Sequence, residues 1–191
     1  MHQIPDSYSI TAARPADITA LIAVDKAAST LFAPTGLLSP EALKSHVPAS
    51  VFEQEIPHEN VRVARDETGW PVGFVLVRQR VRGLYLDQVS VHPDHGRQGL
   101  GRALVMTALD MAARRNLAHV TLSTFRDLPW NGPFYRALGF RELSRKQYDP
   151  YMLDIEDAQS QIMDISQRCF MRCKIHRPLF RFGPRKKETQ R

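Results

Sequence analysis

Residues 84–124 contain an apolar strand, a glycine-rich turn, an amphipathic helix and a second apolar strand, in that order. Segments 84–91 and 119–124 are rich in apolar and β-branched residues, and apolar residues return at helical spacing from Gly99 to about Asn116. A strand, a helix and a strand in succession form a right-handed crossover whose two strands are parallel. The chain is therefore predicted to fold as an α/β domain around this crossover.

Further elements are predicted on both sides of the crossover. Before it we expect helices over 18–32 and from Pro40, a loop over 46–60, and strands over 61–64 and 72–77. After it we expect helices over 132–138 and 151–163 and strands over 140–143 and 169–175. The predicted fold class is α/β (α+β), with a mixed central sheet. An antiparallel meander and the parallel crossover make up this sheet, and helices cover both of its faces.

The positive charge of the chain is concentrated at its C-terminal end. The net charge is +6, yet residues 168–191 hold nine Lys or Arg and one Glu, a local charge of +8 that leaves −2 for the rest. We expect one domain over 1–176 followed by a solvated basic tail over 177–191, because the tail cannot bury enough apolar surface to fold alone. Nucleic acid is not the expected partner, and a nucleic-acid-binding arm is kept as the alternative interpretation of the tail.

Composition and cysteine usage favour a cytoplasmic globular protein. Hydrophobic residues make up 43% and charged residues 24% of the 191 residues. No apolar run approaches the ~20 residues of a membrane span, and the N-terminus lacks a signal-peptide pattern, so no membrane association is expected. Cys169 and Cys173 match no zinc spacing, and on a strand they share a face but lie too far apart to bridge. We interpret them as packing thiols and expect no metal.

The turn between the first strand and the helix has the properties of a pyrophosphate site. Gly96, Gly99 and Gly101 remove the Cβ atoms that would keep an anion off the backbone, and the N–H groups at the helix start point at such an anion. Arg97 and Arg102 add positive charge. A tight turn with glycines for geometry is the competing interpretation. A Walker-type nucleotide site is disfavoured, because the loop lacks Gly-Lys-Ser/Thr.

Two separate motifs resemble the GNAT family of N-acetyltransferases. Val91-x-Pro93 followed by Gly96-Arg97-Gln98-Gly99-Leu100-Gly101 is similar to the family's acetyl-CoA-binding motif. The segment 131–140, Asn-Gly-Pro-Phe-Tyr-Arg-Ala-Leu-Gly-Phe, is similar to its second motif. The two motifs cover about 84–140, and with the meander before them the resemblance spans most of the chain. Gly96 stands where the family pattern has Arg or Gln. Since backbone N–H groups hold most of the pyrophosphate, we expect weakened but retained cofactor binding.

The resemblance implies transfer of an acetyl group from acetyl-CoA to a primary amine by direct attack in a ternary complex. The acceptor would be a small-molecule or peptide amine. Tyr135 takes the position of the family's usual general acid, with an aromatic packing role as the alternative, and Asn131 contacts the cofactor or caps its helix. The implied cofactor-binding residues are Val89, Ser90, Val91, Gly96, Arg97, Gln98, Gly99, Leu100, Gly101, Arg102 and Asn131.

The general base is assigned to Asp87, on the strand that leads to the glycine-rich loop. Family members often use an acidic residue here, and a solvated or arginine-paired carboxylate is the alternative. The weaker candidates are His92, His95, Glu53 and Glu55. A non-catalytic acyl-CoA-binding or sensor module is the alternative function, although Tyr135 argues against it. A homodimer through the late strands is compatible with the sequence.

Overall fold

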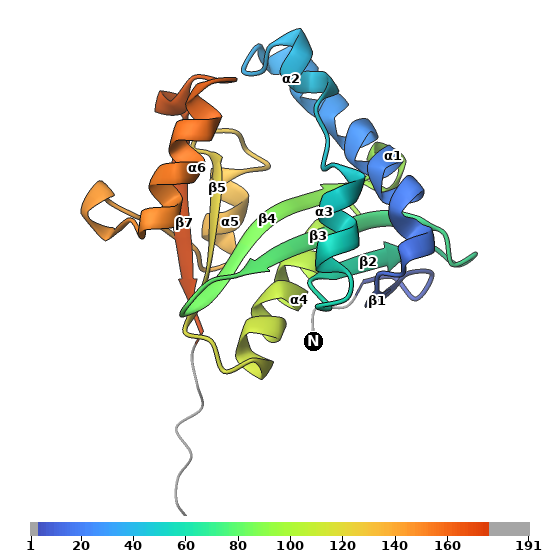
Figure 1. Ribbon diagram of the computed structural model, residues 1–191. Coiled ribbons are helices and arrows are strands. Elements are labelled where there is room, and N and C mark those ends of the chain that lie inside the picture. The colour runs from blue at the N-terminus through green and yellow to red at the C-terminus, as the bar shows by residue number, and fades with distance from the viewer. Residues whose placement is uncertain (1–3, 176–191) are drawn as a thin grey trace, which may run out of the picture.

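The structure, a computed structural model, describes residues 4–175, and its centre is a seven-stranded sheet (Figure 1). The strands are β1 (Ser9–Ala12), β2 (Val61–Arg65), β3 (Pro71–Gln79), β4 (Gly83–Val91), β5 (His119–Phe125), β6 (Arg141–Glu142) and β7 (Arg168–Lys174). Their order across the sheet is β1-β2-β3-β4-β5-β7-β6. Within this sheet β4 and β5 are parallel and every other neighbouring pair is antiparallel. The predicted mixed sheet is confirmed.

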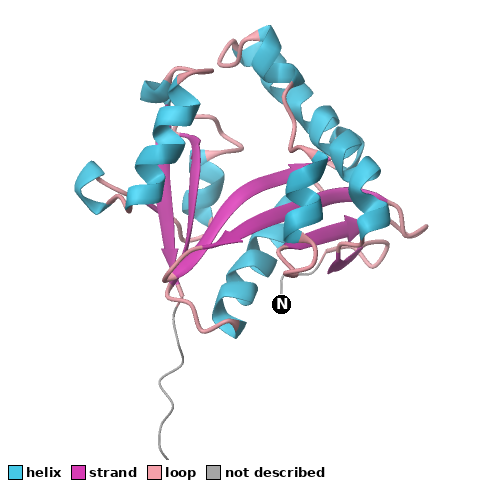
Figure 2. Ribbon diagram, in the orientation of Figure 1, coloured by secondary structure: helices cyan, strands magenta, loops and turns pink. Residues whose placement is uncertain are grey.

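Helices cover both faces of the sheet, as predicted (Figure 2). They are α1 (Ile18–Ser29), α2 (Pro40–Lys44), α3 (Ala49–Glu55), α4 (Leu100–Arg114), α5 (Gly132–Ala137) and α6 (Pro150–Ser160). Helices α1 and α3 pack on one face of β2 and β3, whereas α4 and α5 share a core cluster on the other face. Helix α6 packs Met152 against Tyr85 of β4 and Phe170 of β7. The predicted tail over 177–191 lies outside the described residues.

Two elements differ from what the sequence patterns predicted. The expected loop over 46–60 is wrong, because it contains α3, in which Phe52 is fully buried with its ring centroid 5.3 Å from that of Phe74. Seven residues are too few to show a clear helical period, so tertiary packing decides this helix. Strand β1 was not predicted. It pairs with β2 at the edge of the sheet and is mostly exposed, so no apolar alternation marks it.

Strands β4 and β5 pair over only three residues and then separate. The parallel register joins 83–85 with 119–121, after which the strands continue to Val91 and Phe125 without pairing to each other. On the other side of β4, the register with β3 shifts so that Asp87 has no partner. A bulge of this kind bends the strand and increases its twist. The unpaired halves of β4 and β5 diverge toward the top of Figure 1.

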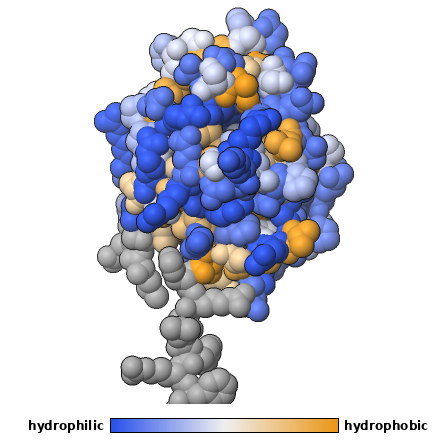
Figure 3. Space-filling view, turned by 90° about the vertical axis from the view of Figure 1, so that its left-hand side faces the viewer, coloured by the Kyte–Doolittle hydropathy of each residue, from blue (hydrophilic) through white to orange (hydrophobic). Residues whose placement is uncertain are grey.

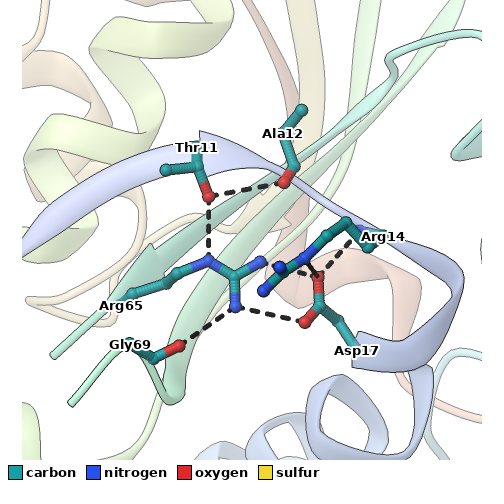
Figure 4. A network of polar contacts seen from close by, with 6 residues as sticks. All are labelled: Thr11, Ala12, Arg14, Asp17, Arg65 and Gly69. Carbon is teal, nitrogen blue, oxygen red and sulfur yellow. Dashed lines mark hydrogen bonds and ion pairs between the residues drawn. The ribbon is translucent and has the colours of Figure 1, made fainter.

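A buried ion pair joins the start of α1 to the sheet (Figure 4). Arg65 donates from Nη2 to Asp17 Oδ2 at 2.7 Å and from Nη1 to Oδ1 at 3.1 Å, and each side chain is 7% exposed. The same guanidinium donates to Thr11 Oγ1 at 2.9 Å and to the carbonyl of Gly69 at 3.2 Å. Burial by itself raises the pKa of Asp17. Hydrogen bonds from Arg65 and the Arg14 backbone outweigh that effect and hold the pKa below its usual value.

The apolar side chains of the chain lie mainly inside the molecule. Three buried clusters between the sheet and its helices contain most of the large ones. The face that carries α6 and β7 is mostly hydrophilic, with hydrophobic residues in separate places (Figure 3). Among the described residues, no helix combines the length and the apolar character needed to cross a bilayer.

We expect Asp17→Asn to lower the free energy of unfolding by about 3–5 kcal/mol at neutral pH, because it leaves the Arg65 guanidinium buried without its counter-charge. The deficit should shrink below about pH 4, since the wild-type pair contributes only while Asp17 is ionised and loses this contribution as the pH falls through its lowered pKa. Urea unfolding at both pH values measures this, with Asp157→Asn on α6 as an exposed control. A deficit below about 1 kcal/mol at neutral pH would contradict the assignment.

Candidate active site

The gap between β4 and β5 holds a cavity of about 480 Å³. Its walls are the unpaired half of β4, the loop before α4, the end of β5, helix α5 and the C-terminal end of α1 with the following 3-10 turn (Thr30–Thr35). It brings together Asp87, Val89, Ser90, Val91, Gly96, Arg97, Gly99, Leu100, Gly101, Arg102, Asn131 and Tyr135. Gln98 is exposed and does not line the cavity. The two sequence motifs therefore meet in one cavity.

The loop before α4 presents backbone donors to the cavity. Gly99 precedes the helix with φ of 80°, a left-handed conformation that favours glycine. The Ala103 N–H donates to the Gly99 carbonyl at 3.0 Å, so the N–H groups of Leu100 and Gly101 lie in the first turn, where a helix offers no acceptor. The positive end of the helix dipole adds to these donors. This arrangement suits an anion such as a pyrophosphate.

Gly96 lies where the backbone leaves little room for a side chain. A Cβ atom at this position would lie 2.9 Å from the carbonyl oxygen of Pro93. The Gly96 N–H already donates to that same oxygen at 2.9 Å, which closes the 3-10 turn Pro93–His95. A larger residue would force this turn to open. The following residue, Arg97, has φ of 58° and lines the cavity.

Tyr135 lines the cavity from α5 and is 8% exposed. Its ring centroid lies 5.1 Å from that of Phe134 and 5.7 Å from that of Phe140, so the residue also packs in the core. Burial raises the pKa of Tyr135 to about 12, against a smaller lowering by the positive charge of Arg168. Within residues 4–175 the hydroxyl has no hydrogen-bond partner, which leaves its proton available to a ligand. Asn131 starts α5 without a side-chain cap bond, so the capping alternative is not seen.

Asp87 lies at the bulge of β4, and its carboxylate is paired with an arginine. Its Oδ2 accepts a hydrogen bond from Arg78 Nε at 2.6 Å, and Arg78 Nη1 lies 3.9 Å from Glu55 Oε1. The side chains of Arg78 and Asp87 are 31% and 30% exposed, and Asp87 also lines the cavity. To take a proton from an acceptor, this carboxylate must exchange its contact with Arg78 for one with the amine.

The weaker base candidates occupy different places. His95 lines the cavity and its Nδ1 forms a hydrogen bond with the hydroxyl of Tyr8 at 3.0 Å, whereas His92 does not line it. Glu53 is exposed on α3, and neither Glu53 nor Glu55 lines this cavity. In the described part of the chain, no three His, Cys, Asp or Glu side chains are grouped in a way that could hold a metal ion.

Several cavity residues were not anticipated from the sequence. Phe32, Phe125 and Trp130 form an aromatic wall, in which the ring centroid of Phe32 lies 5.7 Å from that of Phe125 and 6.2 Å from that of Trp130. Arg168 of β7 completes this side of the cavity. Phe32 was expected only as a core residue of a helix, and none of the others belongs to a recognisable pattern of site residues.

A buried carboxylate beneath the cavity was also missed. Asp25 of α1 accepts hydrogen bonds from Ser90 Oγ at 2.6 Å, from Gln88 Nε2 at 2.7 Å and from the Val47 N–H at 2.8 Å. Because Ser90 and Gln88 lie on the unpaired half of β4, this network holds α1 on the strand that lines the cavity. Ser90 thus directs its side chain toward α1, and only its backbone can serve a ligand in the gap.

Comparisons with known proteins agree with this geometry. The model of the Acetyltransferase (GNAT) family matches residues 33–140. The [ribosomal protein bS18]-alanine N-acetyltransferase of Escherichia coli K12 is 31% identical over 101 residues, which cover 52% of this chain and 68% of that protein.

Solved structures share the fold at low sequence identity. The PaiA N-acetyltransferase from Thermoplasma acidophilum, in complex with coenzyme A, superposes with a TM-score of 0.69 at 17% identity, over 88% of this chain and 99% of that one. The N-acetylglutamate synthase from Neisseria gonorrhoeae, complexed with coenzyme A and N-acetyl-glutamate, gives 0.67 at 16% identity over 89% of this chain, which spans only 35% of that protein. The family match, over more than half of the sequence, shows that this chain belongs to the acetyltransferase (GNAT) family.

Proposed function

We propose that this acetyltransferase moves the acetyl group of acetyl-CoA to a primary amine by direct attack in a ternary complex. The observation that carries the proposal is the single cavity shared by the α4 N-terminus, the unpaired half of β4 and the Tyr135 hydroxyl. An anion site, a strand edge and a proton donor are three of the elements that such a transfer needs from the protein.

The residues present fit acetyl-CoA. The N–H groups of Leu100 and Gly101 and the dipole of α4 suit its pyrophosphate, and no side chain at Gly99 or Gly101 blocks their approach. The backbone of 86–91, which has no strand partner toward β5, can pair with the extended arm that carries the thiol. When bound, acetyl-CoA supplies the acetyl thioester and leaves as a free thiol.

Three groups of the chain carry the proposed chemistry. A backbone N–H of β4 beside Val89 holds the oxygen that becomes negative during transfer. The Tyr135 hydroxyl donates a proton to the departing sulfur. It is protonated at neutral pH because burial raises its pKa to about 12. Asp87 takes the proton of the acceptor amine, directly or through water, once it leaves Arg78.

The acceptor class rests on the family and on one relative. The name of the Escherichia coli relative states an alanine of ribosomal protein bS18 as its acceptor. For this chain we propose the wider class of small-molecule or peptide amines. A cytoplasmic location, the boundary of the domain at 176 and a homodimer remain predictions.

Coenzyme A binding tests the cofactor site. We expect Gly101→Glu to weaken coenzyme A binding by at least about 10-fold relative to Gly101→Gln, because only the former places a negative charge where the pyrophosphate binds. Both should fold, since a Cβ at Gly101 meets nothing nearer than Phe134 Cζ at 3.9 Å. Calorimetry with coenzyme A measures the affinities. Equal affinity of the two variants would remove this helix terminus as the anion site.

Turnover tests the reaction itself. A thiol-release assay with acetyl-CoA and a broad panel of amines should show acceptor-dependent release of coenzyme A by the wild-type protein. Tight coenzyme A binding without release for any amine would favour the non-catalytic alternative, and the absence of both binding and release would exclude the proposed function.

Tyr135→Phe should lower kcat by about 10²-fold and leave coenzyme A affinity unchanged, because the ring still packs and only the donor is lost. Tyr151→Phe is the matched control, since the Tyr151 hydroxyl bonds Thr121 at 2.7 Å and lies outside the cavity. Because burial raises the pKa of Tyr135, its deprotonation should cause no loss of rate below about pH 11 in the wild type. An unchanged kcat in Tyr135→Phe would remove Tyr135 as the acid.

Asp87→Asn should lower kcat/KM by about 10²-fold, because the amide cannot take the proton of the acceptor amine. Arg78→Met is the matched control, since it breaks the same ion pair and keeps the carboxylate. If Arg78→Met loses as much activity as Asp87→Asn, or if Asp87→Asn is fully active, then Asp87 is not the base.

A further inference from the structure

Arg168 is a partly buried arginine that lines the cavity from the β7 side. It is the first residue of β7 and pairs in register with Phe125 of β5. Its Cζ atom lies 4.8 Å from the centroid of the Phe125 ring. The loop before α4, by contrast, follows β4 on the other side of the gap. Arg168 therefore stands across the cavity from the proposed pyrophosphate site.

Its hydrogen-bond partners are all neutral. Nε donates to Ser123 Oγ at 3.2 Å and to Gln159 Oε1 at 3.0 Å, and Nη2 donates to Ser123 Oγ at 3.1 Å. Within residues 4–175, Nη1 has no hydrogen-bond partner, and no carboxylate forms an ion pair with Arg168. The contacts hold the guanidinium in one orientation and leave one of its ends for a ligand.

Arg65, the buried arginine of β2, shows what Arg168 lacks. Arg65 is paired through two hydrogen bonds with Asp17, whereas Arg168 is partly buried, which lowers its pKa, and has no carboxylate partner among residues 4–175. Removing an unpaired charge from water lowers the stability of a protein. A bound ligand with the opposite charge would offset this loss at Arg168. Guanidinium groups bind carboxylates through two parallel hydrogen bonds, and this pairing is strong in a water-poor site.

The residues around Arg168 indicate which other groups the ligand carries. The aromatic wall of Phe32, Phe125 and Trp130 lies on the same side of the cavity, and Tyr135 is close enough for the charge of Arg168 to lower its pKa. A ligand held here by an anionic group would thus have its other end near the proton donor. An apolar or aromatic side chain on that ligand would contact the wall.

Resting on the proposed function, we infer that the acceptor is an amino-carboxylate, whose carboxylate binds Arg168 while its amine points toward the acetyl group. Free amino acids and related small amino acids with an apolar side chain fit this description. Arg168 is then a specificity-determining residue, and neutral amines of the same shape are poor acceptors.

The experiment compares carboxylates with matched carboxamides. With coenzyme A at saturation, calorimetry measures binding of the product-like probes N-acetyl-leucine, N-acetyl-phenylalanine and N-acetyl-tryptophan and of their amides. We expect at least one acid to bind about 10- to 100-fold more tightly than its amide in the wild type. The preference should fall to about 1 in Arg168→Met and be partly kept in Arg168→Lys. Arg114→Met, at the exposed end of α4, should leave it unchanged.

Kinetics with the parent amino acids and amino-acid amides should show the same ratios in kcat/KM. Equal binding of acids and amides in the wild type overturns the inference, and this comparison needs no variant to fold. Failure of every acid to bind also overturns it. A loss of coenzyme A affinity in Arg168→Met would assign the arginine to the cofactor instead. The absence of thiol release with any amine would count against the proposed function, while acid-over-amide binding would still support the anion site.

Discussion

Strands β4 and β5 are hydrogen-bonded neighbours for three residue pairs, and beyond them neither strand has a partner on the side of the gap. The bulge at Asp87 bends β4 at this point, so the sheet opens instead of closing. Backbone N–H and C=O groups need partners, and an open strand edge inside a protein is a place for an extended ligand to supply them. The crossover helix α4 begins at the same end of β4, which puts its N-terminus beside that edge.

Elements far apart in the sequence close the cavity around this opening. Asp25 holds α1 on β4 through Ser90 and Gln88, and the Phe32–Phe125 contact brings the end of this helical segment to β5 across the gap. Two arginines of the sheet have different surroundings. Arg65, paired with Asp17, joins β1, the start of α1 and the β2–β3 turn, whereas Arg168 lines the cavity and has no ion-pair partner among residues 4–175.

Local patterns predicted the elements that have strong local signals. The apolar period of α4, the β-branched runs of β3 and β5, and the Ser39 cap, whose Oγ accepts from the Ala42 N–H at 3.1 Å, all appear where expected. The short helix α3 and the exposed edge strand β1 were missed, because contacts with Phe74 and pairing with β2 stabilise them, and neither leaves a period in the sequence. Gly96, interpreted from the sequence as a lost side chain, lies so close to the Pro93 carbonyl that a Cβ atom would be crowded there.

The sequence by itself determined the strand–turn–helix unit, its glycines and Tyr135, because backbone conformation and helix termini depend on a few neighbouring residues. In the structure, all but one of the site residues proposed from the sequence line one cavity. Only the tertiary structure decided that Asp87 faces Arg78 on the neighbouring strand, that Asp25 binds β4, and that Arg168 lies beside an aromatic wall with no carboxylate partner among residues 4–175. Each depends on how separate elements pack together. Charge pairing and desolvation depend on distance in space, which no local pattern encodes.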